Sequence, residues 1–102
     1  RTDDLIEPCR DADALVIEAT YASEEAEMAA RFGHLTARQS AELARAANVK
    51  HLFLVHISRR YPARDILREA RAIFPNTTVP KDLDHYRITR EAVERVKNSD
   101  GR

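Results

Sequence analysis

The sequence predicts an α/β fold, because short apolar segments alternate with amphipathic helical segments along the chain. Residues 14–17 (ALVI) and 52–57 (LFLVHI) have the length and the apolar composition of buried strands. A segment with helical periodicity follows at residues 37–47, and another at residues 62–74. Strand–helix–strand connections favour a parallel sheet, so we expect the two strands to be adjacent and parallel, with both helices packed on them.

The composition is that of one small globular domain or of a part of a larger one. The 102 residues include 17 basic and 17 acidic side chains, a balance that excludes gross attraction to nucleic acid. The longest aliphatic and aromatic run, residues 52–55, is far shorter than a membrane span of ~20 residues. Cys9 is the only cysteine, which excludes an internal disulfide and fits a reducing compartment. We therefore expect a cytoplasmic protein without a membrane partner.

Local signals place the boundaries of the longer helix. Thr36 is followed three residues later by Gln39, which is the pattern of a capping box at a helix start. Ala37, Ala41 and Ala44 recur at helical spacing, so one face of this helix is small enough to approach a neighbour closely.

The rest of the chain gives shorter elements. Ser23 precedes a stretch of helix formers at residues 24–30, and Gly33 ends it. Apolar residues on both sides of Pro80 predict one or two short strands. We expect residues 1–88 to form the main unit, and residues 89–102 to form a short surface helix and a frayed tail.

Two polar side chains stand where an α/β sheet presents its ligands, and a third occupies a nearby turn of the sequence. Glu18 directly follows the first strand, and His56 lies near the end of the second. His34 occupies the turn between two helices, just ahead of the capping residue. Ligands gather at the carboxyl ends of parallel strands, and a carboxylate with two imidazoles suits metal-assisted hydrolysis.

Each of these residues also has a structural interpretation. A histidine in a strand is commonly a hydrogen-bonded core residue, a histidine before a helix is commonly a loop residue, and Glu18 can cap a backbone N–H. Two histidines 22 positions apart form a weak metal motif. The spacing alone leaves both interpretations open.

Four segments in fixed order carry a more specific signal. They are residues 13–21 (DALVIEATY), 33–37 (GHLTA), 55–61 (VHISRRY) and 69–77 (EARAIFPNT). This series resembles the C-terminal part of ribonuclease Z, the tRNA 3′-processing endonuclease family of the metallo-β-lactamase superfamily. The resemblance extends over about residues 13–88 and implies the C-terminal half of an αβ/βα sandwich.

The resemblance implies a role for each matching residue. Glu18 and Thr20 match the family's His-Glu-Ala-Thr motif, and His34 and Thr36 match its His-Ser-Thr motif. In the family this glutamate and this histidine cooperate in proton transfer near the scissile phosphate, which makes Glu18 and His34 the candidate catalytic residues.

A third motif implies the metal and substrate contacts. His56 matches the last metal-binding histidine of the family. Ser58, Arg60 and Tyr61 match the segment that lies near the RNA end, and with Thr36 they are the candidate substrate-binding residues. A guanidinium has a physical use there, because it can hold two phosphate oxygens in a fixed geometry.

The chain departs from the family pattern at two motif positions. Ile17 stands where the family has the first histidine of its motif, and Leu35 stands where it has serine. The resemblance also implies that the remaining metal ligands belong to sequence ahead of Arg1.

The resemblance implies the chemistry of the complete enzyme. Two Zn²⁺ ions would generate a hydroxide that cleaves precursor tRNA after the discriminator nucleotide. The partners would be precursor tRNA, the N-terminal half of the same fold and, since the family commonly dimerises, a second copy of the enzyme. We expect the 102 residues alone to be metal-free and inactive.

Two other functions remain open at this point. Ile17 in place of histidine leaves room for a metallo-β-lactamase-fold hydrolase that acts on other phosphodiesters or esters. The isolated chain would also suit a non-catalytic α/β interaction module.

Overall fold

The computed structural model describes residues 2–22, 25–31, 33–59, 61–81 and 84–96. Three parallel strands, β1 (Leu15–Glu18), β2 (Leu52–Val55) and β3 (Thr77–Thr78), form a sheet in the order β1-β2-β3. Leu15 is aligned with Leu52, and Glu18 with Val55. The adjacent, parallel pairing expected for the first two strands is confirmed.

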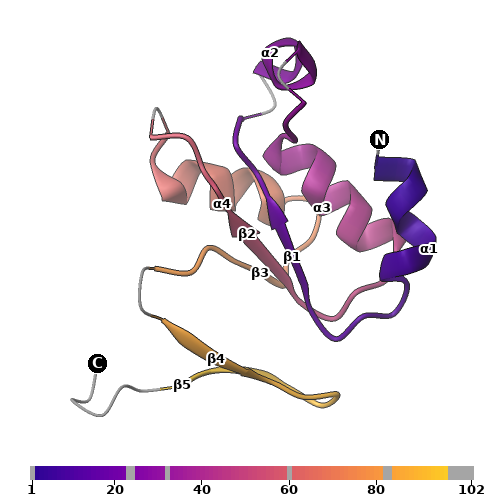
Figure 1. Ribbon diagram of the computed structural model, residues 1–102. Helices are drawn as coiled ribbons and strands as arrows, with labels where there is room; N and C mark the ends of the chain where they lie inside the picture. Colours follow the sequence, from indigo (N-terminus) through magenta and orange to yellow (C-terminus); the bar gives the residue numbers. More distant parts are fainter. Residues whose placement is uncertain (1, 23–24, 32, 60, 82–83, 97–102) are drawn as a thin grey trace.

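The helices expected on this sheet are α3 (Ala37–Ala46) and α4 (Ala63–Arg71), which lie side by side on one face (Figure 1). The capping box at Thr36 and Gln39 is present, and Asn48 takes the left-handed conformation that follows the helix end. The side of α3 toward the sheet is built from alanines that are 0% exposed, so the helix backbone lies close to the strands. Those alanines are Ala37, Ala41, Ala44 and, just past the helix, Ala47.

Shorter helical segments complete this layer. The chain begins with the 3₁₀ turn η1 (Thr2–Leu5) and α1 (Ile6–Cys9), neither of which the sequence predicted. Ile6 and Cys9 pack against the core and hold this segment beside α3. Helix α2 (Ala26–Arg31) overlaps the stretch of helix formers at residues 24–30, and the predicted cap Ser23 lies outside the described residues. None of the helices described has the length and apolar character of a membrane span.

The opposite face of the sheet is only partly covered, whereas the apolar composition of residues 14–17 predicts a buried strand. Val16 on this face is 61% exposed. Next to it, Phe53 is buried beneath the ring of Tyr86, which belongs to the hairpin β4 (His85–Ile88) and β5 (Val93–Val96). The hairpin forms a second, partial layer below the sheet (Figure 1). An apolar strip therefore remains uncovered among the described residues, since Ile88 is also 43% exposed.

The prediction of a surface helix at residues 89–97 is wrong, because residues 93–96 form strand β5. Val93 pairs with Ile88 and Val96 with His85 in an antiparallel register, and the turn closes through hydrogen bonds between Thr89 and Ala92. A helix this short would be marginal by itself, whereas pairing with β4 satisfies the backbone groups of both strands. The boundary expected after residue 88 thus falls inside a hairpin. The frayed tail predicted at residues 98–102 lies outside the described residues.

Candidate functional site

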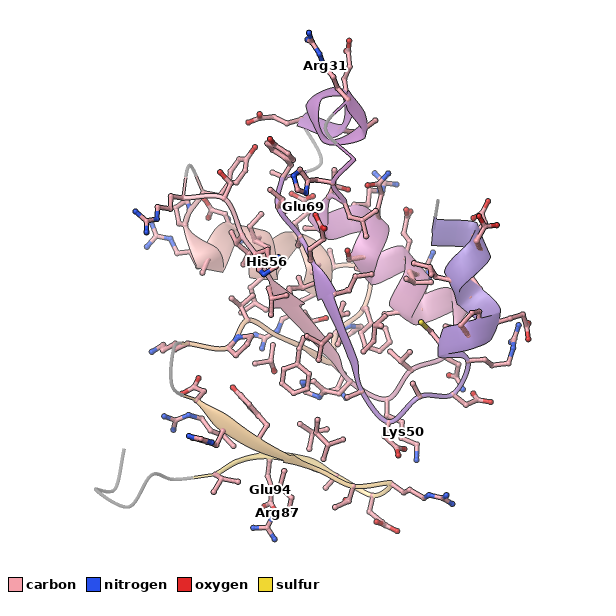
Figure 2. All side chains as sticks on the ribbon, in the orientation of Figure 1. Arg31, Lys50, His56, Glu69, Arg87 and Glu94 are labelled. Carbon is pink, nitrogen blue, oxygen red and sulfur yellow. The ribbon has the colours of Figure 1, made fainter. Side chains whose placement is uncertain are left out.

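The polar residues singled out by the sequence meet at the carboxyl edge of the sheet. Glu18 is the last residue of β1 and is aligned with Val55, the last residue of β2. The amide of Ala19 donates to the carbonyl of Val55 over 2.9 Å, so the segments are still hydrogen-bonded where β1 and β2 end. His56 directly follows Val55, and Figure 2 shows its ring at this end of the sheet. Glu18 and His56 therefore lie at the same end of the sheet.

The carboxylate of Glu18 is held by three donors. Its Oε2 atom accepts from Thr20 Oγ1 over 2.9 Å and lies 2.8 Å from His34 Nδ1. The backbone amide of Leu35 donates to the same oxygen over 3.2 Å. The Glu18 side chain is only 28% exposed, so these bonds are partly shielded from water. The fold thus joins Glu18 to His34 across 16 positions of sequence.

These contacts settle the charge of Glu18 and the tautomer of His34. Partial burial raises the pKa of Glu18, but hydrogen bonds from Thr20, His34 and the Leu35 amide outweigh burial, so the pKa lies below its ordinary value of 4.5. An ionised carboxylate only accepts, so Nδ1 of His34 carries a hydrogen. The other ring nitrogen, Nε2, does not contact Glu18, and the 43% exposure of the side chain keeps the ring accessible to a ligand.

The local sequence explains how His34 reaches this place. Gly33 takes a φ of +73°, a left-handed conformation that turns the chain after α2. Thr36 then starts α3, where its hydroxyl accepts from the Gln39 amide over 3.1 Å. The amide of Ala37 donates to Tyr21 O over 3.0 Å, which ties the helix start to the chain leaving β1. Thr36 is 1% exposed, so the contacts of its side chain in this structure are internal.

His56 has a different environment. Its φ of 56° is left-handed, a conformation that costs energy for any residue with a side chain, and the residue is exposed. A hollow of about 560 Å³ lies beside it, and Arg59, Tyr61 and Lys81 are among the residues that line it. The site therefore combines an exposed imidazole with two cationic side chains, a combination suited to a phosphate.

The segment after His56 is fastened to the rest of the site. The amide of Ser58 donates to Thr20 O over 3.0 Å, which joins the segment to the loop that carries Glu18. The hydroxyl of Tyr61 donates to a carboxylate oxygen of Glu25, ahead of α2. Arg60, the third residue predicted to contact substrate here, lies outside the described residues.

The departure at Ile17 has a structural explanation. Side chains alternate along β1, and Ile17 packs against the core together with Leu15. Thr20, His34 and Leu35 supply the contacts of the Glu18 carboxylate without any side chain from position 17. The replacement of histidine by isoleucine thus leaves this hydrogen-bond network complete.

A larger hollow, of about 730 Å³, lies at the opposite edge of the sheet. It is lined by the turns that precede β1 and β2, where Lys50 forms an ion pair with Asp13 over 3.3 Å. No histidine lines it, and parallel sheets place their ligands at the other end. We therefore assign the candidate site to the smaller hollow.

Among the described residues, no three His, Cys, Asp or Glu side chains are grouped closely enough to hold a metal ion. His56 has the donor chemistry and the exposure of one ligand, but one imidazole does not make a metal site. The described residues alone therefore do not fit a metal centre.

Two residues of the site escaped the sequence analysis. Ser40 Oγ donates to the backbone carbonyl of Glu18 over 2.6 Å, and Lys81 lines the hollow from the far end of the chain. Ser40 stands four residues after Thr36, so it lies on the same face of α3, and that spacing was the only local signal. No local pattern predicted a role for Lys81, because it is distant from His56 in sequence and only the fold brings the two residues to the same hollow.

Comparison with known proteins places these motifs in a family. No protein-family model matches the chain. The ribonuclease Z of Bradyrhizobium sp. (strain ORS 278) is 48% identical over 87 residues, which is 85% of this chain and 29% of that protein. The ribonuclease Z of Brevibacillus brevis is 43% identical over 105 residues, which is 96% of this chain and 31% of that protein.

The solved structures agree. The metallo-β-lactamase fold protein YhfI from Bacillus subtilis matches with a TM-score of 0.69 and 22% identity, over 78% of this chain and 32% of that one. The short form of human tRNase Z matches with a TM-score of 0.60 and 28% identity, over 78% of this chain and 26% of that one. The chain spans less than a third of the length of the curated relatives named above, and it matches their C-terminal part. In sequence and in fold, the chain is a relative of the C-terminal part of ribonuclease Z, with the α/β architecture of the corresponding part of the metallo-β-lactamase fold.

Proposed function

We propose that the chain supplies the C-terminal part of a zinc-dependent endoribonuclease that cleaves precursor tRNA 3′ to the discriminator nucleotide. The observation that carries this proposal is the hydrogen bond between Glu18 and His34 at the sheet edge where His56 emerges. The likeness to ribonucleases Z supports the choice of substrate.

In this proposal Glu18 and His34 move a proton. The Glu18 carboxylate fixes the ring through Nδ1, and His34 Nε2 exchanges a proton with an oxygen of the scissile phosphodiester. Thr20 and the Leu35 amide help to keep the carboxylate ionised, so it remains an acceptor for the Nδ1 hydrogen of His34.

The metal role falls to His56. It would be one ligand of a zinc centre completed by residues of the rest of the enzyme, and its exposure at the sheet edge supports that role. Bound zinc would supply an activated hydroxide as the nucleophile.

Substrate binding falls to the hollow beside His56. Its cations Arg59 and Lys81 would contact RNA phosphates, together with Ser58, Arg60 and Tyr61. Thr36 would contribute indirectly, since its buried hydroxyl holds the start of α3, next to His34.

The partner of the chain would be the N-terminal part of the same fold. The uncovered strip at Val16 and Ile88 supports this assignment, because both side chains are apolar and exposed. The complete enzyme would act in the cytoplasm as a homodimer, and the 102-residue chain alone would be inactive and free of metal.

A chimera tests the proposal. This chain replaces the matching C-terminal part of the Bradyrhizobium ribonuclease Z, and cleavage of precursor tRNA is compared with hydrolysis of a chromogenic phosphodiester. We expect cleavage after the discriminator nucleotide at a rate near that of the parent, and no cleavage by the 102-residue chain. A folded, metal-loaded chimera that hydrolyses only the small phosphodiester would favour a general hydrolase. A chimera inactive on both substrates would contradict the proposal.

A further inference from the structure

Ser40 contacts Glu18 in a way that none of the motifs predicts. Its hydroxyl donates to the backbone carbonyl oxygen of Glu18 over 2.6 Å, and the side chain is 0% exposed. The carboxylate of the same residue is held by Thr20, His34 and the Leu35 amide. Glu18 is therefore fastened at both its side chain and its main chain.

Contacts with the side chain and with the main chain of Glu18 both come from the start of α3 and the residues just before it. His34 and Leu35 immediately precede α3, and Ser40 lies one turn inside it. The amide of Ser40 donates to Thr36 O over 3.1 Å, so the first turn of the helix connects the two contact points rigidly. The end of β1 and the start of α3 are thus held at a fixed separation.

We propose that Ser40 is a positioning residue, whose hydrogen bond to the Glu18 carbonyl fixes the distance between Glu18 and His34 for proton transfer. This inference rests on the proposed function. A positioned proton transfer is sensitive to small displacements, because donor and acceptor must stay within hydrogen-bond reach. Removing the hydroxyl also takes one donor from a partly buried carbonyl, so the strand end gains freedom to shift.

The competing explanation is that Ser40 only stabilises the fold. Buried hydroxyls are normally hydrogen-bonded, whatever their function. A variant at Ala41 distinguishes the two explanations. Ala41 is the next residue on α3 and is equally buried, but its side chain carries no polar atom. Ala41→Gly weakens the helix without touching the bond to Glu18.

The test uses the active chimera and measures kcat and KM on precursor tRNA, together with thermal stability. For Ser40→Ala we expect kcat to fall by about three- to tenfold at unchanged KM, the size of one lost hydrogen bond. Ser40→Cys keeps the size and a weak donor, and should give an intermediate kcat. Ala41→Gly should lower the melting temperature and leave kcat unchanged. Equal losses of kcat in Ser40→Ala and Ala41→Gly would overturn the inference.

The kcat of a double variant distinguishes a positioning role of Ser40 from a purely structural role. When Glu18→Gln has already slowed the reaction, adding Ser40→Ala should cause no further loss of kcat, because Ser40 acts through Glu18. A full additional loss would overturn the inference. An unaltered rate in Glu18→Gln alone would overturn the proposed role of Glu18 as well, whereas a slow Glu18→Gln beside an unaltered Ser40→Ala would overturn only the role of Ser40.

Discussion

The two sides of the candidate site differ in how much of their structure lies within the chain. On one side, the Glu18 carboxylate has three donors and a half-buried position. On the other, His56 is an exposed imidazole in a left-handed conformation, beside an open hollow with Arg59 and Lys81. The Glu18 side is built from local motifs and from tertiary contacts with His34, Leu35 and Ser40, while the described residues form no group of three potential metal ligands at the His56 side.

In the proposed function, this difference means that proton transfer and metal binding depend on different parts of the complete fold. The contacts that orient His34 come from β1 and the start of α3, both inside the chain. A metal centre at His56 would need further ligands from the rest of the complete enzyme, because the described residues form no group of three potential ligands. Variants on the two sides should therefore fail in different ways.

The largest effect is expected for His56→Ala in the chimera. We expect hydrolysis of precursor tRNA to fall to background and metal content to drop, because one metal position loses a ligand. Activity and metal content by elemental analysis are measured on the same sample. His85→Ala is the matched control, since His85 is exposed on β4. Retention of both metal and activity in His56→Ala would show that His56 is not a ligand.

A smaller effect is expected for His34→Ala. The rate should fall by ~10²–10⁴, the range for losing a positioned proton donor, while metal content stays at the parental level. The same assay and metal analysis apply. A parallel loss of zinc and activity would mean that His34 is itself a ligand, and the contrast between the two sides would then disappear.

The uncovered strip on the sheet should make the 102-residue chain self-associate at micromolar concentration. We expect Val16→Lys to weaken association by about tenfold in analytical ultracentrifugation, because it places a charge on a 61% exposed apolar position. His85→Lys is the control, since it adds the same charge at an exposed residue of β4 that is not part of the strip. A cooperative, well-folded monomer would contradict the prediction that the exposed apolar side chains of the strip cause self-association.

The smallest effect concerns pH. The folded chain holds the pKa of Glu18 below its ordinary value, so Glu18 stabilises the fold above that value, and this contribution is lost as pH falls through the lowered pKa. Glu18→Gln should therefore lower the free energy of unfolding by about 1 kcal/mol near pH 7 and by less near pH 3. Thermal unfolding of both chains at the two pH values measures this. An equal difference at both would contradict the contribution of the charge.

Local signals explain which parts were predictable. The capping box at Thr36 and Gln39 lies within four residues, so the sequence located the start of α3 correctly. Strand β5 was misassigned as a helix, because Glu91, Ala92, Glu94 and Arg95 are good helix formers, whereas the pairing of its valines with β4 is a tertiary contact. The contact of Ser40 with Glu18 escaped prediction for the same reason. Periodicity placed Glu18 and His56 at one sheet edge, but only the resemblance to a family brought His34 to Glu18.

The left-handed conformation of His56 has a consequence for how the protein evolves. Glycine and asparagine adopt a φ of 56° at lower cost than histidine does, so the fold itself does not favour the residue found there. A random library of this chain selected for folding alone should lose histidine at position 56 early and accumulate glycine. A library selected for RNA cleavage in the complete enzyme should retain it, and the two outcomes would separate selection for stability from selection for function at a single position.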